Sequence, residues 1–215
     1  MQSLDAKTLP GLFERFAARF EAERDALIAL DGKVGDSDLG LTMSKAFMAA
    51  RDKVVGEFAD ADISTQFKQA GGAISKAAPS TMGTLMATGF LRGGKALADA
   101  EVLDVAGLAA FWRAYADGVA MRGKAQLGDK TVLDVLDPIA RAYEAQAEAG
   151  ATLEMAGAAA AQAASNALEA TKELVAQHGK AAAFQEKSRG VQDAGGTVAC
   201  MLAEELEIFL GEAAN

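Results

Sequence analysis

The segment 152–176, which reads TLEMAGAAAAQAASNALEATKELVA, is rich in alanine. Alanine is the strongest helix former because it loses no side-chain entropy in a helix. We therefore expect one long helix here, with small side chains that allow neighbouring helices to approach closely. The whole chain favours helices in the same way: 51% of its 215 residues are hydrophobic, and only three are proline. This composition predicts an all-α chain and argues against both a β-sandwich and a disordered chain.

Apolar residues recur with helical spacing along nearly the whole sequence. Working outward from 152–176, the pattern predicts helices over residues 9–30, 38–55, 65–77, 80–98, 104–121, 130–149 and 197–210. About eight helices result, joined by short loops and two longer ones. No linker rich in proline or serine divides them, so we expect a single domain over residues 1–215.

The charge balance excludes several classes of protein. The net charge is −9 and the pI is about 4.7, whereas binding to nucleic acid normally requires a basic surface. No stretch is long and apolar enough to span a bilayer or to resemble a signal peptide, so we expect a cytoplasmic protein without a membrane partner. Cys200 is the only cysteine and His178 the only histidine. We expect His178, followed by Gly179, to be solvated or to cap a helix end.

The loop 31–40, DGKVGDSDLG, places Asp31, Asp36 and Asp38 within eight residues among glycines. Carboxylates are the oxygen ligands that Mg²⁺ prefers, and Mg²⁺ in phosphate chemistry commonly takes one or two of them. The three aspartates are therefore candidate metal ligands. The alternative is structural, because Asp38 could cap the helix that follows and Asp31 could end the preceding one.

Three further polar loops each lead into a helix: 77–84 with Ser80 and Thr81, 122–131, and 179–197. Helix N-termini have free N–H groups that suit phosphate. Taken singly, each loop also fits ordinary capping or a solvated turn. In combination, four such helix N-termini could meet at one end of a bundle.

Three motifs in this order resemble the nucleotide-binding L subunit of bacterial dihydroxyacetone kinase, which is also the C-terminal domain of single-chain kinases. They read LDGKVGDSDLG over 30–40, RGKAQLGDKT over 122–131 and QDAG over 192–195. The resemblance implies a closed antiparallel barrel of eight helices. It also implies ADP or ATP bound at one end with two Mg²⁺ ions.

The resemblance further assigns residues. The metal ligands would be Asp31, Asp36 and Asp38. Lys180 would lie near the transferred phosphate as a catalytic group. The nucleotide contacts would be Leu39, Gly40, Leu41, Thr42, Ser80, Thr81, Gly123, Val132, Lys180, Asp193, Ala194 and Gly195. The chain departs from the family at Leu39, Lys180 and Ala194, where histidine, arginine and proline are common.

The function implied is phosphoryl transfer to a short-chain ketose such as dihydroxyacetone. In the family the ketose is bound covalently through a histidine of a separate K-type subunit or domain, so a K-type partner is expected. A separate chain of this length favours ADP as a retained coenzyme, recharged by a phosphohistidine carrier of the sugar phosphotransferase system. Three alternatives stay open: an ATP-dependent erythrulose-type kinase subunit, a nucleotide-loaded module that regulates a transcription factor, and a homologue that binds an apolar ligand inside the barrel.

Overall fold

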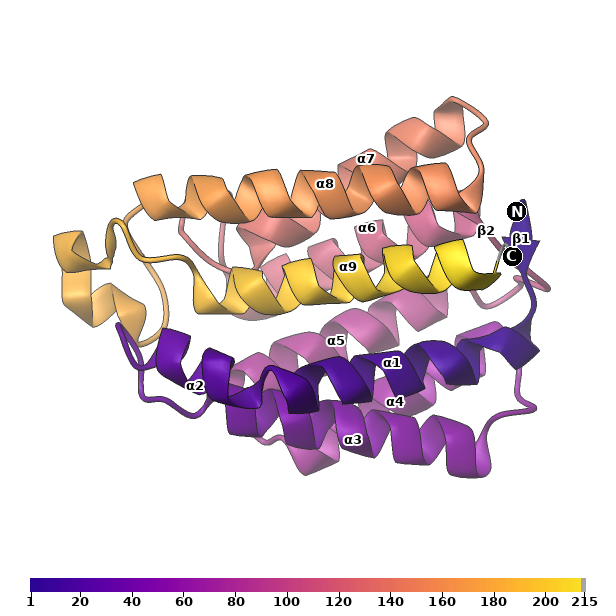
Figure 1. Cartoon of the computed structure of the whole chain (residues 1–215), viewed down its shortest axis with the longest axis horizontal. Helices are drawn as coiled ribbons and strands as arrows, with labels where there is room; N and C mark the ends of the chain where they lie inside the picture. The colour runs from indigo at the N-terminus through magenta and orange to yellow at the C-terminus, as the bar shows by residue number, and fades with distance from the viewer. Residues whose placement is uncertain (214–215) are drawn as a thin grey trace.

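The computed structural model describes residues 1–213, so the last two residues of the expected domain lie outside it (Figure 1). Within this range the chain is almost entirely helical. The α-helices are α1 (Leu9–Ala22), α2 (Arg24–Asp31), α3 (Leu39–Glu57), α4 (Ile63–Ala77), α5 (Thr81–Ala96), α6 (Val105–Gly123), α7 (Leu133–Glu148), α8 (Leu153–Ala170) and α9 (Ala194–Ala213). Three 3₁₀ segments are η1 (Ala6–Thr8), η2 (Thr171–Glu173) and η3 (Ala181–Ser188). A short antiparallel ribbon pairs β1 (Ser3–Leu4) with β2 (Leu103–Asp104).

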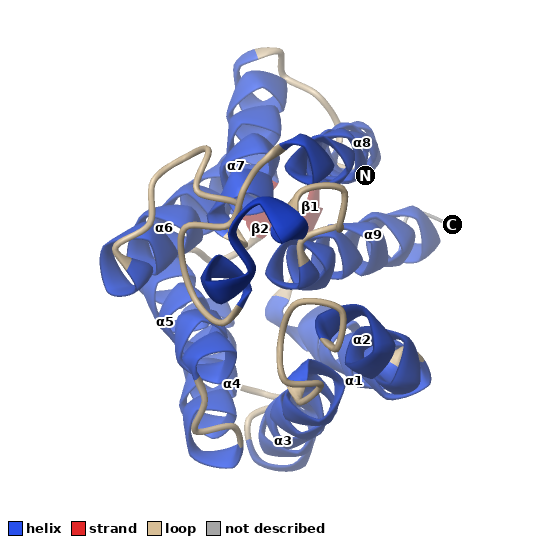
Figure 2. Cartoon of the chain, turned by 90° about the vertical axis from the view of Figure 1, so that its left-hand side faces the viewer, coloured by secondary structure: helices blue, strands red, loops and turns tan. Residues whose placement is uncertain are grey.

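The helices form a closed ring (Figure 2). From α3 onward each helix packs against the next, α1 packs against α3, and α9 returns to pack against α1. Successive helices run in opposite directions, so α3, α5, α7 and α9 all begin at the same end of the ring (Figure 1). The predicted all-α barrel is confirmed, and α1 and α2 together take the place of one of its eight helices.

Several predicted boundaries are wrong. The helix expected over 9–30 is interrupted at Glu23, and α2 turns toward α3. Gly40 makes this approach possible, since a Cβ there would collide with the carbonyl oxygen of Arg24. Helix α8 ends at Ala170 rather than near residue 176, and α9 begins three residues earlier than expected. The segment between α8 and α9 therefore begins earlier than expected, and it contains η3.

Aromatic rings fill the interior of the barrel. Phe13, Phe16, Phe47, Phe67 and Phe90 pack with centroids 5.8–6.5 Å apart in mostly edge-on pairs, the arrangement that the ring quadrupole favours. The apolar void among these rings measures about 10 Å³, roughly the space of one water molecule. The expected close approach of small residues occurs on α8, where Ala156, Ala160 and Ala164 are all fully buried.

Candidate nucleotide and metal site

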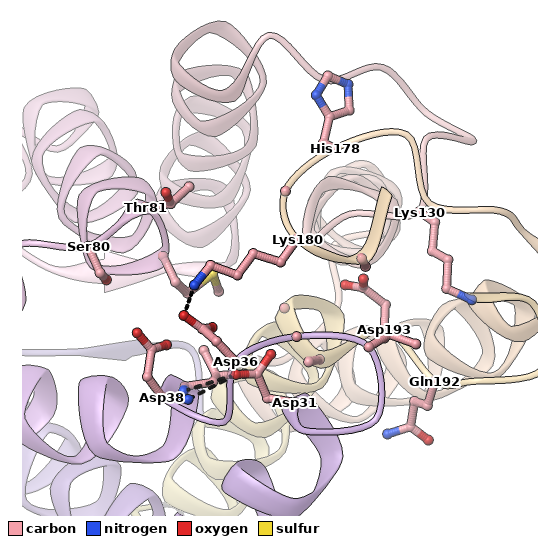
Figure 3. Close-up of a pocket in the computed structure, with 18 of the residues that line it drawn as sticks. Asp31, Asp36, Asp38, Ser80, Thr81, Lys130, His178, Lys180, Gln192 and Asp193 are labelled. Atoms are coloured by element: carbon pink, nitrogen blue, oxygen red, sulfur yellow. Dashed lines mark hydrogen bonds and ion pairs between the residues drawn. The ribbon is translucent and has the colours of Figure 1, made fainter. Parts of the chain in front are cut away.

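A cavity of about 480 Å³ opens at the end of the barrel where α3, α5, α7 and α9 begin (Figure 3). Its size is in the range of 300–1,000 Å³ that is typical of small-molecule sites. The four expected helix N-termini do meet there. The residues lining it are Asp31, Val34, Gly35, Asp36, Asp38, Leu39, Pro79, Ser80, Thr81, Met82, Lys130, His178, Gly179, Lys180, Ala181, Gln192, Asp193, Ala194 and Gly195.

Three aspartates form the floor of the cavity between α2 and α3. Asp31 is the last residue of α2, Asp36 lies in the loop and Asp38 directly precedes α3. One carboxylate oxygen from each lies within 4.8 Å of the other two. Gly35 allows the loop to fold over Asp31, because a Cβ at this position would collide with its carboxylate. Like charges gathered this closely repel one another unless a cation lies among them.

The hydrogen bonds of the cluster decide between capping and metal binding for Asp38. Its side chain makes no capping bond to α3. Instead Asp31 accepts from the backbone N–H groups of Asp38, at 3.1 Å, and Leu39, at 3.4 Å. Asp31 therefore ends its own helix and also caps the following one. The carboxylates of Asp36 and Asp38 point into the cavity, which suits a hard cation such as Mg²⁺ (Figure 3).

Lys180 reaches across the cavity from the segment that joins α8 to α9 (Figure 3). Its ammonium forms an ion pair with the Asp36 carboxylate. Lys180 is 64% exposed and Asp36 38% exposed. Exposed ion pairs contribute about 0–1 kcal/mol, so this pair can be given up at little cost when another anion enters. The sequence motifs do not predict an ion pair between Lys180 and Asp36.

Ser80 and Thr81 lie at the start of α5, facing the aspartates. Ser80 has extended backbone geometry and its Oγ accepts from the Gly83 N–H at 3.0 Å. The first N–H groups of a helix have no acceptor within it, and the helix dipole adds partial positive charge there. This wall of the cavity is therefore suited to phosphate oxygens.

Asp193 closes the opposite wall at the start of α9. Its carboxylate accepts from the Gly196 N–H at 2.6 Å. Burial raises the pKa of Asp193 to about 6, although this hydrogen bond opposes the shift. Ala194 and Gly195 continue the wall, and Gly195 packs beside Val132.

Some of the expected nucleotide contacts lie elsewhere. Leu41 and Thr42 line a neighbouring hollow of about 300 Å³ that shares Asp38, Pro79 and Ser80 with the main cavity. Gly40 packs against α2, Gly123 ends α6, and Val132 is buried beneath Gly195. None of these three lines either hollow within the described chain.

Two wall residues were not predicted as site residues. His178, expected to be solvated or to cap a helix end, is 37% exposed, and it pairs through Nε2 with Asp129 Oδ2 at 3.0 Å. This hydrogen bond is among the causes that lower the pKa of Asp129. Lys130 is buried in the wall next to Asp193. In the sequence, Lys130 stands out only as part of the loop 122–131, and His178 only as the single histidine.

Comparison with known proteins agrees with this geometry. The family model of the DAK2 domain matches residues 33–207. This chain belongs to the DAK2 domain family. It is 32% identical over 193 residues to the PEP-dependent dihydroxyacetone kinase, ADP-binding subunit DhaL, of Escherichia coli K12, covering 90% of this chain and 91% of that one. It is 31% identical over 202 residues to the L-erythrulose kinase of Pectobacterium atrosepticum, covering 90% of this chain and 34% of that protein.

Solved structures show the same DAK2 fold. The native dihydroxyacetone kinase of C. freundii superposes with a TM-score of 0.68 and 25% identity, covering 93% of this chain and 34% of that chain. The same kinase in complex with AMP-PNP and Mg²⁺ superposes with a TM-score of 0.71 and 24% identity, covering 97% of this chain and 34% of that chain. The chain thus spans about a third of these kinases. Among residues 1–213, no helix combines the length and apolar content needed to cross a membrane.

Proposed function

We propose that this chain is the nucleotide-binding subunit of a dihydroxyacetone-type kinase, working in the cytoplasm as one domain over residues 1–215. The observation that carries the proposal is the carboxylate cluster of Asp31, Asp36 and Asp38 facing the N-terminus of α5 across one cavity. A nucleoside di- or triphosphate suits this arrangement, because its phosphates can meet N–H groups on one side and metal held by carboxylates on the other. The DhaL relatives are named as ADP-binding subunits.

The donor set fits Mg²⁺. It consists of oxygen ligands only, at the edge of a cavity open to solvent, as is common for Mg²⁺ that also binds phosphate. We propose two ions, with Asp31, Asp36 and Asp38 as their protein ligands. Bound Mg²⁺ would neutralise phosphate charge, which together with positioning accounts for most of the catalysis of phosphoryl transfer.

The protein's own residues then position the phosphates. Ser80 and Thr81 present the start of α5 to phosphate oxygens. At the start of α3, Leu39 lines the same cavity, and Leu41 and Thr42 line the hollow beside it. Lys180 is long enough to cross the cavity and carries the positive charge that would meet the transferred group. Asp193, Ala194 and Gly195 form the opposite wall, and Val132 packs behind Gly195, whereas Gly123 lies beside Leu85 at the end of α6.

The ketose has no covalent anchor in this cavity. His178 is the only histidine of the chain, and its Nε2 already pairs with Asp129. We therefore propose that a separate K-type subunit holds the ketose and docks at the cavity mouth. The relatives named PEP-dependent support a phosphohistidine carrier protein as the source of phosphate. A transcription regulator as an additional partner is compatible with this assignment.

A second candidate is a subunit with erythrulose as its substrate. It rests on the relatives named as erythrulose kinases, which are 30–32% identical to this chain. The third possibility raised by the sequence, an apolar ligand inside the barrel, finds too little space in a void of about 10 Å³.

The test begins with the purified protein. Denaturing it and analysing the supernatant should release ADP if the nucleotide is a retained coenzyme. Nucleotide-free protein should gain about 2.7 kcal/mol of stability at a Mg-ADP concentration 100 times Kd. With a K-type partner, turnover on dihydroxyacetone and erythrulose is then compared with either ATP or a phosphorylated carrier as donor. Absence of any thermal shift with both Mg-ADP and Mg-ATP would refute the proposal.

A further inference from the structure

The segment 171–191 connects α8 to α9 and forms one side of the cavity. It carries Lys180 and three other wall residues, yet most of it is turns and short 3₁₀ segments. Most bonds within it are local, and three bonds join its beginning to its end. In one of them the guanidinium of Arg189 donates to the Glu173 carbonyl. Gly190 donates its N–H to the Lys172 carbonyl at 2.8 Å, and Ala176 donates to Ser188 Oγ at 3.0 Å. Its position over the cavity therefore depends on contacts with other parts of the chain.

The main contact of this kind is made by Lys130. Its Nζ donates to four backbone carbonyls of the segment. They belong to Thr171 at 2.8 Å, Leu174 at 3.1 Å, Ser188 at 2.8 Å and Val191 at 2.7 Å. Two of these residues lie at the beginning of the segment and two at its end. An ammonium has three N–H donors, so one of them must be shared.

Burial distinguishes this lysine from an ordinary surface lysine. Lys130 is only 2% exposed. A buried ammonium is costly unless polar groups replace its water shell, and here four carbonyl oxygens do so. A buried cation adds little to stability compared with an apolar side chain of similar volume. The arrangement is therefore better explained by the need to hold these four carbonyls at one point.

The backbone around Lys130 is built to present the side chain. Its φ is +58°, in the left-handed region that costs energy for a residue with a Cβ. Asp134 maintains this turn by accepting from the N–H groups of Gly128, at 2.6 Å, and Thr131, at 2.7 Å. The ammonium points away from the aspartate cluster, on the far side of Asp193 from Lys180 (Figure 3).

We propose that Lys130 is a positioning residue for phosphoryl transfer, a tethered cation that closes both ends of the segment 171–191 around one point and so holds Lys180 over the nucleotide. The proposal rests on the proposed function, because it assumes that the cavity binds a nucleotide. It assigns Lys130 no contact with the reacting atoms. We expect Lys130 to affect how well ordered the segment is, how fast the nucleotide is released and where Lys180 lies.

The first experiment compares Lys130→Met with Lys187→Met, which removes an exposed lysine of the same segment. Hydrogen exchange of the nucleotide-free proteins should show at least about tenfold faster exchange across 171–191 in Lys130→Met, because even one charge-assisted hydrogen bond is worth about a factor of ten. Exchange in α3 and α5 should not change. Lys187→Met should match the wild type. Unchanged exchange in Lys130→Met would overturn the proposal.

The second experiment measures function with the K-type partner. Lys130→Met should release Mg-ADP at least about tenfold faster and lower kcat, while KM for the ketose stays the same, because the ketose is held elsewhere. A general loss of folding would change all of these together. Lys130→Arg provides a variant that keeps the charge. Its N–H donors are spread over three nitrogens in one plane, so they cannot gather the four carbonyls around a single atom, and kcat should fall. Unaltered release and kcat in both variants would refute the proposal.

Chemical rescue supplies the strictest test. In Lys130→Ala, propylammonium chloride should restore slow exchange and slow release, because it replaces the missing chain and its N–H donors. Tetramethylammonium chloride at the same ionic strength carries the charge without N–H donors and should not rescue. Equal effects of the two salts would contradict the tethered-cation role. If the wild type binds no Mg-ADP, the proposed function fails, but hydrogen exchange still judges the role of Lys130.

Discussion

The two ends of the barrel use the same residue types for different purposes. At the end away from the cavity, Asp62 and Asp104 precede α4 and α6 and each accepts a backbone N–H of its own helix at 2.7 Å. At the cavity end, Asp38 precedes α3 in the same way but makes no capping bond. Asp31 takes over the capping of α3 from the preceding helix.

This difference shows how carboxylates that can bind a ligand are distinguished from carboxylates that stabilise helices. A capping aspartate has a carboxylate oxygen engaged by the backbone, so less of its carboxylate is available to a ligand. Transferring the cap to Asp31 leaves the carboxylates of Asp36 and Asp38 free to face the cavity (Figure 3). A carboxylate near a helix N-terminus is thus insufficient to identify a structural cap. The hydrogen-bond partner distinguishes the two roles.

The largest expected effect comes from comparing a lysine at the cavity end of the barrel with a lysine at the far end. Lys180→Met should lower kcat by about 10³-fold, the effect of removing a cation that stabilises phosphoryl transfer. The matched change at the other end, Lys95→Met in the last turn of α5, should leave kcat unchanged. Lys180→Arg should retain most of the activity. Steady-state kinetics with the K-type partner provides the measurement, and similar rates for Lys180→Met and Lys95→Met would break the comparison.

The second prediction concerns the uncapped aspartate. Removal of groups that merely support a metal ligand costs about 10–100-fold in affinity, so Asp38→Ala should weaken Mg²⁺-dependent ADP binding by at least about 100-fold. Stability without metal should stay the same or rise slightly, because repulsion within the cluster falls and no cap is lost. Titration calorimetry and urea unfolding check the two parts. A loss of stability without a loss of binding would show that Asp38 is a cap after all.

The third prediction uses pH. Burial raises the pKa of Asp193 to about 6, so its stabilising contribution is complete below about pH 4 and is lost as the pH rises through 6. Asp193→Asn should therefore raise the free energy of unfolding by about 1–3 kcal/mol above pH 6 and change it little near pH 4.

At the far end of the barrel, the pH dependence of stability should have the opposite sign. Hydrogen bonds from Thr65 lower the pKa of Asp62. Its contribution is present above the unfolded pKa near 4 and disappears as the pH falls. Asp62→Asn should thus cost stability at pH 7 and approach the wild type under acid conditions. Urea unfolding of both variants from pH 2 to 8 tests the contrast, and parallel pH profiles would contradict it.

The smallest effect should come from a far-end cap. Asp104→Ala removes the bond to the Gly107 N–H and should lower the free energy of unfolding by about 1 kcal/mol. Affinity for Mg-ADP should be unchanged, because Asp104 lies at the opposite end of α6 from the cavity. Asp104→Asn retains an acceptor and should be nearly neutral. A weakened nucleotide affinity in Asp104→Ala would show that the two ends are coupled.

Much of the molecule could be predicted from the sequence because its signals are local. Helical spacing and alanine content indicate where helices form, within a few residues at each end. The aspartate loop is also local, since its three carboxylates lie within eight residues of one another. The break at Glu23 was missed because it depends on how closely α3 passes α2, which is a contact between helices.

The sequence by itself determined an acidic, alanine-rich, all-helical chain and the three clustered aspartates, through propensity and spacing along the chain. Only the tertiary structure decided which aspartate caps α3, that Lys180 meets Asp36, and that Lys130 gathers four carbonyls 41 to 61 residues away. Those contacts join segments far apart in sequence. They arise when the ring of helices closes and brings four helix N-termini to one end, so no local sequence pattern predicts them.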